Sequence, residues 1–525
     1  ERPCFAVDGR TQELPRRAGV SSFGVGGANA HIIVEEPCRE TAAQLESDDP
    51  SHQDMPLQIL TLSANGRGAL EAMARRIRDH VTDHPELNLR DVCSTLSVGR
   101  RHFANRLACV ISSRDRLIQS LDQCLRGETP AGCFQGQADS GASRGKTAFL
   151  FTGQGAQYPG MASDLYHAHP VVKEALDECA FILDAWLERP LLEVLLADPE
   201  SPEAGLIDQT LYTQLGLFAV EYALSRLWAS WGVQPDAVMG HSLGELVALT
   251  FAGVLSLEDG LRLVHARAKM MQALPGGGKM AAVRLSEQAL SDFLKGYEDE
   301  VAVASVNAPD QVVISGQGDS VEAICSALEG QQVETTTLQV SHAFHSPLIE
   351  PMLDEYLETI DSITVMDGEI PVVSCVDGSQ LEQGRFDSAY WRRQVRQPVR
   401  FMEAMEYLDS LGVTTFVEVG PHPVLLGMGS LCLPYDDRVW LPSMRRKADA
   451  FQTLYESVAR IYVHGANIDW KGFHAHGRPR KVDLPTYAFQ HERYWLQPTL
   501  PEPRPKPERS ARNDLAYEVC WEPKP

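Results

Sequence analysis

The chain has 525 residues, 44% of them hydrophobic and 22% charged, which predicts a globular protein of three or four packed units rather than one core. No run of about 18 apolar residues occurs, so we expect no membrane partner. The formal net charge of -24 argues against nucleic acid as a partner, because phosphate binding needs a basic face.

The 11 cysteines are odd in number and scattered, and none forms a C-x-x-C pair. This pattern argues against a disulfide framework and against a structural zinc site, so we predict no metal. It favours a reducing compartment. The N-terminus also lacks the apolar core of a signal peptide, and we therefore expect a cytoplasmic protein.

The first 38 residues contain a glycine-rich turn followed by the strand-like "HIIVEE". They are too few to bury a core, and the chain does not begin with Met, so we expect an excerpt of a longer chain. Residues 39–56 are polar, acidic and without periodicity, which predicts a flexible linker.

Residues 57–146 alternate between strand and helix patterns, which predicts a small α/β domain. The faint phosphate-loop pattern at 141–147 is rejected, because Ser140 stands where the first glycine is needed. Residues 147–445 form the largest unit. Their alternating strands and helices predict an α/β fold with a mostly parallel sheet covered on both faces.

Within that unit, residues 279–339 follow the order β-α-β-β-α-β, which is typical of a ferredoxin-like subdomain. A site at the junction of this insertion with the sheet is expected to lie in a cleft. Beyond 445, residues 446–497 end in an aromatic-rich segment that we expect to fasten onto neighbouring domains. Residues 498–525 are predicted to be an extended, proline-rich linker and the start of another domain.

Gly240-His241-Ser242-Leu243-Gly244 fits G-x-S-x-G between a strand-like and a helix-like run, the pattern of a nucleophile elbow. Such a turn exposes a serine hydroxyl at a helix N-terminus, where free N–H groups can receive an oxyanion. The alternative is a serine that only caps the helix.

A serine nucleophile needs a base, and "VSHAFHSPLIEPM" offers His342 and His345. Two histidines three residues apart are also compatible with metal binding, although no third ligand stands nearby. No acidic residue stands out between Ser242 and these histidines. A Ser–His dyad oriented by a main-chain carbonyl is chemically sufficient.

Five motifs in order carry a family resemblance: "FTGQGAQYPGM", "GHSLGEL", Arg267 placed 25 residues after the serine (267 minus 242), "SHAFHSPLIEPM" and "VEVGPHPVL". Together they resemble the malonyl-CoA:acyl carrier protein acyltransferase domain of modular type I polyketide synthases. The flanks continue the resemblance. Residues 1–38 are similar to the C-terminal end of a ketosynthase, 57–146 to the ketosynthase-acyltransferase linker, and 446–497 to the post-acyltransferase linker.

The resemblance implies a role for each matching residue. Ser242 would be the acyl-accepting nucleophile and His345 its general base, because His345 directly precedes "SPLIEPM". Gln154 and the N–H of Leu243 would form the oxyanion hole. Arg267 would bind the free carboxylate of a malonyl group.

Four further positions follow from the same resemblance. Gln214 matches a pocket glutamine, and Gln394 matches the residue whose carbonyl steadies the histidine. His342 and Phe344 lie in "HAFH", which resembles the malonyl-selecting version of this motif. Phe344 would fill the space that an α-methyl group needs.

The resemblance thus implies transfer of malonyl from malonyl-CoA, through a seryl ester, to the phosphopantetheine of an acyl carrier protein, with no permanently bound cofactor. The implied partners are the carrier protein, the ketosynthase and downstream domains of the same synthase. Two basic stretches, 392–400 and 444–447, are candidate docking sites for the carrier protein. Selectivity for methylmalonyl or another extender, a serine hydrolase or thioesterase, and a non-catalytic spacer remain alternatives.

Overall fold

The computed structural model describes residues 4–7, 10–13, 15–35, 57–138, 145–382, 386–477 and 479–493. The predicted linker at 39–56 and the stretch 498–525 lie outside these ranges, as does most of the rejected phosphate-loop pattern. No helix in the described ranges is both long and apolar enough to cross a membrane.

The described part of the N-terminal segment forms two hairpins. Strands β1 (Cys4–Val7) and β2 (Arg10–Glu13) pair with each other, as do β3 (Arg17–Phe23) and β4 (Asn29–Glu35). The strand predicted from "HIIVEE" is β4. All residues of β3 and β4 are exposed, including Phe23 and Ile33, which agrees with the expectation that this segment is too small to bury a core.

Residues 57–138 form the small α/β domain that the sequence predicts, hereafter the linker domain. Its antiparallel sheet has the order β5-β6-β7, from Gln58–Ala64, Asn105–Ile111 and Cys133–Gln137. Three helices pack on this sheet: α2 (Arg67–Asp83), α3 (Leu89–Val98) and α4 (Arg114–Leu125). Their apolar faces are spaced with helical periodicity, and they close the core of this domain.

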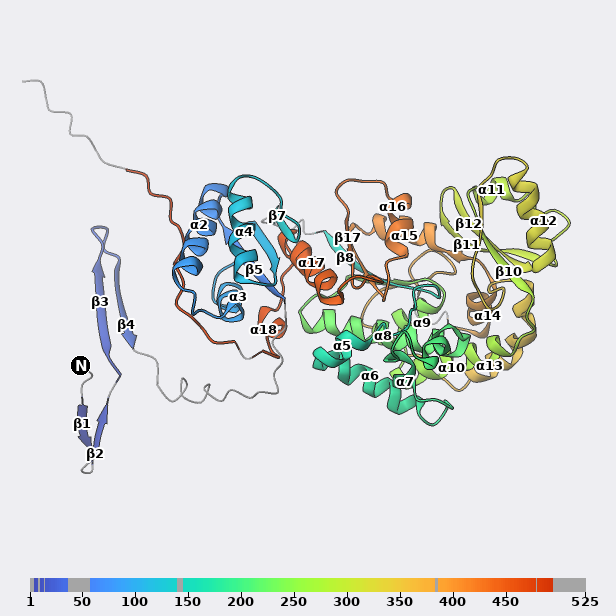
Figure 1. Ribbon diagram of the computed structural model, residues 1–525, viewed down its shortest axis with the longest axis horizontal. Coiled ribbons are helices and arrows are strands. Elements are labelled where there is room, and N and C mark those ends of the chain that lie inside the picture. The colour runs from blue at the N-terminus through green and yellow to red at the C-terminus, as the bar shows by residue number, and fades with distance from the viewer. Residues whose placement is uncertain are drawn as a thin grey trace, which may run out of the picture. The chain divides into compact units, whose positions relative to one another are not determined.

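The largest unit is built on a five-stranded, fully parallel sheet (Figure 1). Its central strands are continuous apolar runs that are buried on both faces, as parallel strands require. The strand order is β14 (Val372–Val373), β9 (Ala237–Gly240), β8 (Lys146–Phe151), β16 (Val413–Val419) and β17 (Val439–Pro442).

Helices cover both faces of this sheet (Figure 1). The long helix α8 is buried along nearly its whole length because other helices pack around it. The helices that matter for the site or cover the sheet are α5 (Ser163–Ala168), α6 (Pro170–Leu183), α7 (Leu191–Leu195), α8 (Thr210–Ser230), α9 (Leu243–Phe251), α10 (Leu257–Ala273), α13 (Leu353–Ile360), α14 (Ser388–Arg396), α15 (Phe401–Ser410) and α16 (Leu425–Cys432).

The ferredoxin-like insertion is confirmed. Its strands are β10 (Gly278–Val283), β11 (Val301–Ala308), β12 (Gln311–Gln317) and β13 (Thr335–Thr337), with helices α11 (Glu287–Leu290) and α12 (Gly318–Glu329). The sheet order is β13-β10-β12-β11, and β15 (Val399–Arg400) adds a parallel strand beside β11.

Two elements of the insertion are short. Helix α11 is a single turn, and strand β13 has only three residues. Gly296, with φ +89°, lies in the turn between α11 and β11.

The chain after residue 445 returns to the linker domain. Helix α17 (Ala450–Val463) contacts both β17 of the large sheet and β6 and β7 of the linker domain, and the short α18 (Trp470–Phe473) follows it. The Tyr487 hydroxyl accepts a hydrogen bond from the Asn65 N–H at 3.0 Å. This contact agrees with the expected fastening role of the aromatic segment, of which Tyr494 and Trp495 lie outside the described residues.

Candidate active site

The turn around Ser242 has the geometry of a nucleophile elbow. Strand β9 ends at Gly240, helix α9 begins at Leu243, and Ser242 between them has φ 53°, a strained value for a residue with a side chain. A Cβ on Gly240 would lie 1.9 Å from the Gly244 carbonyl carbon, and one on Gly244 would lie 2.2 Å from the Phe151 oxygen. Both flanking positions therefore require glycine. The Ser242 side chain makes no capping hydrogen bond to α9, which removes the simple helix-cap alternative.

The structure brings His345, and not His342, to the serine. The Ser242 Oγ lies 2.7 Å from the His345 Nε2, and the His345 Nδ1 lies 2.8 Å from the Gln397 carbonyl oxygen. Because a carbonyl only accepts, Nδ1 carries the proton and Nε2 is free to accept from the serine. Burial, and next the positive charge of Arg267, lower the pKa of His345 to about 3. The imidazole is therefore neutral at physiological pH.

The prediction that Gln394 supplies the orienting carbonyl is wrong. Gln397 supplies it, one residue beyond the last turn of α14, where the extended backbone turns its carbonyl toward the histidine. Gln394 lies inside α14, and its side-chain Nε2 instead donates to the main-chain oxygen of Ser242 at 2.8 Å. Gln394 thus braces the elbow rather than the base.

Arg267 lies beside the nucleophile and is only 1% exposed. One guanidinium nitrogen donates to the Ser242 Oγ at 2.8 Å and another donates to the Gln214 Oε1 at 2.7 Å. The Arg267 Nε has no partner, and no carboxylate in the described part of the chain forms an ion pair with this side chain. Burial lowers the pKa of Arg267. A buried cation without an ion-pair partner is costly, so an anion placed beside Arg267 would be stabilised.

The two predicted oxyanion-hole residues come from two neighbouring segments, Leu243 from the elbow and Gln154 from the loop after β8. Leu243 is the first residue of α9, so its N–H has no partner within the helix. Gln154 lies in the loop after β8, and this loop touches the elbow, since a Cβ on Gly153 would be 3.0 Å from the His241 carbonyl oxygen. No hydrogen bond holds the Gln154 side chain among the described residues.

His342 and Phe344 are placed in the segment that leads into His345. The His342 Nε2 is 3.1 Å from the Leu274 carbonyl oxygen, so this histidine is tied to the end of α10 and not to the serine. The Phe344 side chain is 7% exposed, and its ring centroid lies 6.3 Å from that of His342. Phe344 is thus packed in the wall next to the base.

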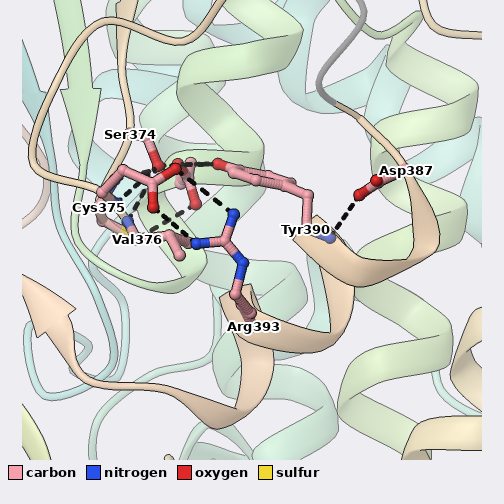
Figure 2. Close-up of polar contacts among 8 residues, drawn as sticks. Ser374, Cys375, Val376, Asp387, Tyr390 and Arg393 are labelled. Atoms are coloured by element: carbon pink, nitrogen blue, oxygen red, sulfur yellow. Dashed lines mark hydrogen bonds and ion pairs between the residues drawn. The ribbon is translucent and has the colours of Figure 1, made fainter.

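Sequence reasoning missed a buried network behind the elbow. Glu245, on α9, accepts hydrogen bonds from the Tyr390 hydroxyl at 2.6 Å and from the Cys375 N–H at 3.1 Å. The Tyr390 hydroxyl also lies 3.0 Å from the Ser374 Oγ. Figure 2 shows Tyr390 and Arg393 reaching from α14 toward the loop at 374–376. The network therefore clamps the helix that leads to Gln397 against the helix that begins at the nucleophile.

The two basic stretches differ in how far their charges are already neutralised. All four arginines of the 392–400 stretch form ion pairs with acidic residues: Arg392 with Asp354, Arg393 with Asp377, Arg396 with Glu350 and Arg400 with Glu287. In the 444–447 stretch, residues 445–447 are exposed, and no ion pair to them is found in the described ranges.

The fold and the site place the protein in the class of α/β proteins that hold a serine on a tight strand-to-helix turn with nucleophile-elbow geometry. The family model described as an acyl transferase domain matches residues 148–468, and one described as a CurL-like polyketide synthase C-terminal region matches residues 58–121. The chain therefore belongs to the acyl transferase domain family of polyketide synthases.

Known proteins agree with this assignment. The chain is 42% identical over 489 residues to the phenolphthiocerol synthesis polyketide synthase type I Pks15/1 of Mycobacterium marinum, which covers 92% of the chain but 23% of that protein. The chain spans only a small part of such relatives: 6% of polyketide synthase GfsA of Streptomyces halstedii and 27% of the PKS-NRPS hybrid synthetase ATPKS of Aspergillus niger.

Solved structures show the same fold. The acyltransferase domain from the second module of the salinomycin polyketide synthase is 39% identical, with a TM-score of 0.69, covering 82% of this chain and 98% of that one. The malonyl CoA-acyl carrier protein transacylase from Coxiella burnetii is 28% identical, with a TM-score of 0.56, covering 62% of this chain and all of the other.

Proposed function

We propose that the protein transfers a malonyl group from malonyl-CoA to the phosphopantetheine thiol of an acyl carrier protein, through an ester on Ser242. One observation carries the proposal: the buried Arg267 has no acidic partner in the described residues and lies 2.8 Å from the Ser242 Oγ. A free carboxylate on the acyl group would supply the missing anion and would fix the thioester beside the nucleophile.

The first half-reaction forms the seryl ester. The neutral His345 accepts the Ser242 proton at Nε2 while Oγ attacks the thioester carbonyl. The developing oxyanion would be received by the Leu243 N–H and by Gln154. Collapse of this intermediate breaks the carbon–sulfur bond, and the proton on His345 passes to the departing CoA sulfur. The Gln397 carbonyl supports the transient imidazolium through the Nδ1 proton.

The second half-reaction runs the same steps in reverse with a different thiol. His345 takes the proton of the carrier protein's phosphopantetheine, and the thiolate attacks the malonyl ester. Ser242 leaves and regains its proton from His345. The carrier protein would dock near residues 445–447, because their positive charge is not already taken up by neighbouring carboxylates in the described structure.

Selectivity for malonyl over methylmalonyl is proposed to come from Phe344. Its packed ring would leave no room for an α-methyl group next to His345. Exclusion of one methyl group by shape is worth about 1–3 kcal/mol, so the preference should be measurable and incomplete.

The hydrolase alternative lacks support at two positions. A hydrolytic triad would place a carboxylate on the base, whereas the His345 Nδ1 is bonded to a main-chain carbonyl. A thioesterase for neutral acyl groups would also have no use for the buried charge of Arg267.

Intact-protein mass spectrometry tests the proposal. The chain is incubated briefly with equimolar malonyl-CoA and methylmalonyl-CoA, and we expect a malonyl adduct that is absent in Ser242→Ala and retained in Ser410→Ala, an exposed serine on α15. A mainly methylmalonyl adduct would refute the role of Phe344 and leave the transfer reaction intact. Free acid without an adduct would indicate hydrolysis. The absence of both the adduct and the free acid would indicate a non-catalytic spacer.

A further inference from the structure

The linker domain brings three cysteine thiols together, although they lie on three different elements. Cys109 is on β6, Cys124 is in the last turn of α4, and Cys133 begins β7. Their three sulfur atoms all lie within 4.8 Å of one another. Spacing along the chain gave no sign of this cluster, because a helix and a turn separate its members.

Two of the thiols face each other across paired strands. Cys109 and Cys133 are directly opposite in the antiparallel β6–β7 ladder. The next pair is hydrogen-bonded, with the Val110 N–H donating to the Gly132 carbonyl at 2.8 Å. Cys109 and Cys133 therefore form a non-hydrogen-bonded pair, the kind in which opposing side chains come closest. The paired strands β6 and β7 thus fix the positions of two of the three sulfur atoms.

Helix α4 supplies the third cysteine, Cys124, and a serine hydroxyl, that of Ser120. Cys124 is only partly buried, whereas Cys109 and Cys133 are buried, so the cluster has one side open to solvent. Ser120 lies one turn earlier on the same face of α4 and is fully buried. Its hydroxyl is buried and interacts with the Cys133 side chain. A buried oxygen thus lies next to one of the three sulfurs.

We propose that Cys109, Cys124 and Cys133 form a binding site for a thiophilic d10 cation, Zn²⁺ or Cu⁺, with the Ser120 hydroxyl available as a fourth donor. Cysteine sulfur selects these soft cations over Mg²⁺ or Ca²⁺. Metal–sulfur bonds of about 2.3 Å place three trigonal sulfurs about 4 Å apart, so the triangle needs to contract by less than about 1 Å. Binding releases thiol protons to solution and ties α4 to the β6–β7 hairpin.

Metal titration of the full chain tests this proposal without any use of activity. The reduced, chelator-stripped protein is titrated with Zn²⁺ against a chromophoric chelator, and with Cu⁺ under anaerobic conditions. We expect one equivalent of one of these ions to bind and to raise the thermal midpoint. Co²⁺ in place of Zn²⁺ should give a thiolate-to-metal charge-transfer band.

Variants locate the binding. Cys124→Ser should weaken binding by about 100-fold or more, since it removes one of three sulfur ligands from a partly exposed position. Cys325→Ser, a partly buried thiol on α12, should leave binding unchanged. Circular dichroism and malonyl loading of each variant confirm that it is folded.

Three results would overturn the proposal. The first is a reduced chain that binds neither ion stoichiometrically. The second is binding of equal strength in Cys124→Ser. The third is a freshly isolated protein in which thiol counting and mass show Cys109 joined to Cys133 by a disulfide, because that bond would remove two of the ligands.

Discussion

On the proposed function, replacing Arg267 with glutamine should separate recognition of the malonyl carboxylate from the chemistry at Ser242. The change removes the charge and leaves a shorter, neutral amide in its place. A hydrogen bond between charged groups contributes about 1.5–3 kcal/mol, so loss of a two-pronged arginine–carboxylate contact should cost about 3–6 kcal/mol. This corresponds to a drop of about 10²- to 10⁴-fold in kcat/KM for malonyl loading.

The assay is single-turnover acylation of Ser242 by malonyl-CoA and, separately, by acetyl-CoA. Acetyl carries no second carboxylate, so its loading should not fall, and the malonyl preference should collapse. Arg262→Gln is the matched control, because Arg262 is on the same helix but only partly buried and paired with Glu258.

An equal loss with both acyl groups would refute the reasoning. Arg267 also donates to the Ser242 Oγ, and a parallel loss would mean that its role is to hold the nucleophile rather than to read the substrate. Full malonyl loading by Arg267→Gln would refute it as well.

Three other predictions follow from named contacts. Because burial, and next a nearby guanidinium, lower the pKa of His345 to about 3, acylation kcat/KM should stay flat from pH 7 to about 4 and fall only as the imidazole becomes protonated below that; a decline centred near pH 6.5 in a folded enzyme would contradict this. Gly244→Ala places a Cβ 2.2 Å from the Phe151 carbonyl oxygen of β8, so it should lower the free energy of unfolding by about 1–3 kcal/mol and abolish most of the activity. The control Gly427→Ala, whose Cβ would have no atom within 4 Å, should be neutral or stabilising. Thermal melting and acyl-loading assays measure both variants. Tyr390→Phe removes a 2.6 Å hydrogen bond to Glu245 and should lower stability by about 1–3 kcal/mol in denaturant unfolding; an unchanged midpoint would mean that the network does not clamp the two helices.

Local patterns predicted the features that depend on neighbouring residues. The elbow could be read from five residues because both glycines and Ser242 lie within one tight turn, in which a Cβ on Gly240 would lie 1.9 Å from the Gly244 carbonyl carbon. The ferredoxin-like insertion could be read because its strand and helix periods alternate over some sixty residues. The pairing of Ser242 with His345 followed only from the family resemblance, since the two are far apart in sequence.

Contacts between distant loops could not be predicted. Gln394 and Gln397 differ by about one helical turn, and the orienting role goes to Gln397 because α14 ends at Arg396. No local pattern announces where a helix of nine residues ends to within one position. Likewise, Glu245 meets Tyr390 only after the sheet has brought α9 and α14 together, so its buried carboxyl could not be assigned a partner from sequence.

On the proposed function, the buried charge of Arg267 links recognition of the substrate carboxylate to the basicity of His345. The positive charge of Arg267 contributes, after burial, to the low pKa of His345. A malonyl carboxylate bound to Arg267 would neutralise much of that charge, and the pKa of His345 would rise toward the range in which an imidazole is an effective base. An acyl group without a carboxylate would leave Arg267 unpaired and the base weak. The carboxylate of the substrate would thus serve both as the recognised group and as the activator of the dyad, which needs only the Gln397 carbonyl, and no third acidic residue, to orient its histidine.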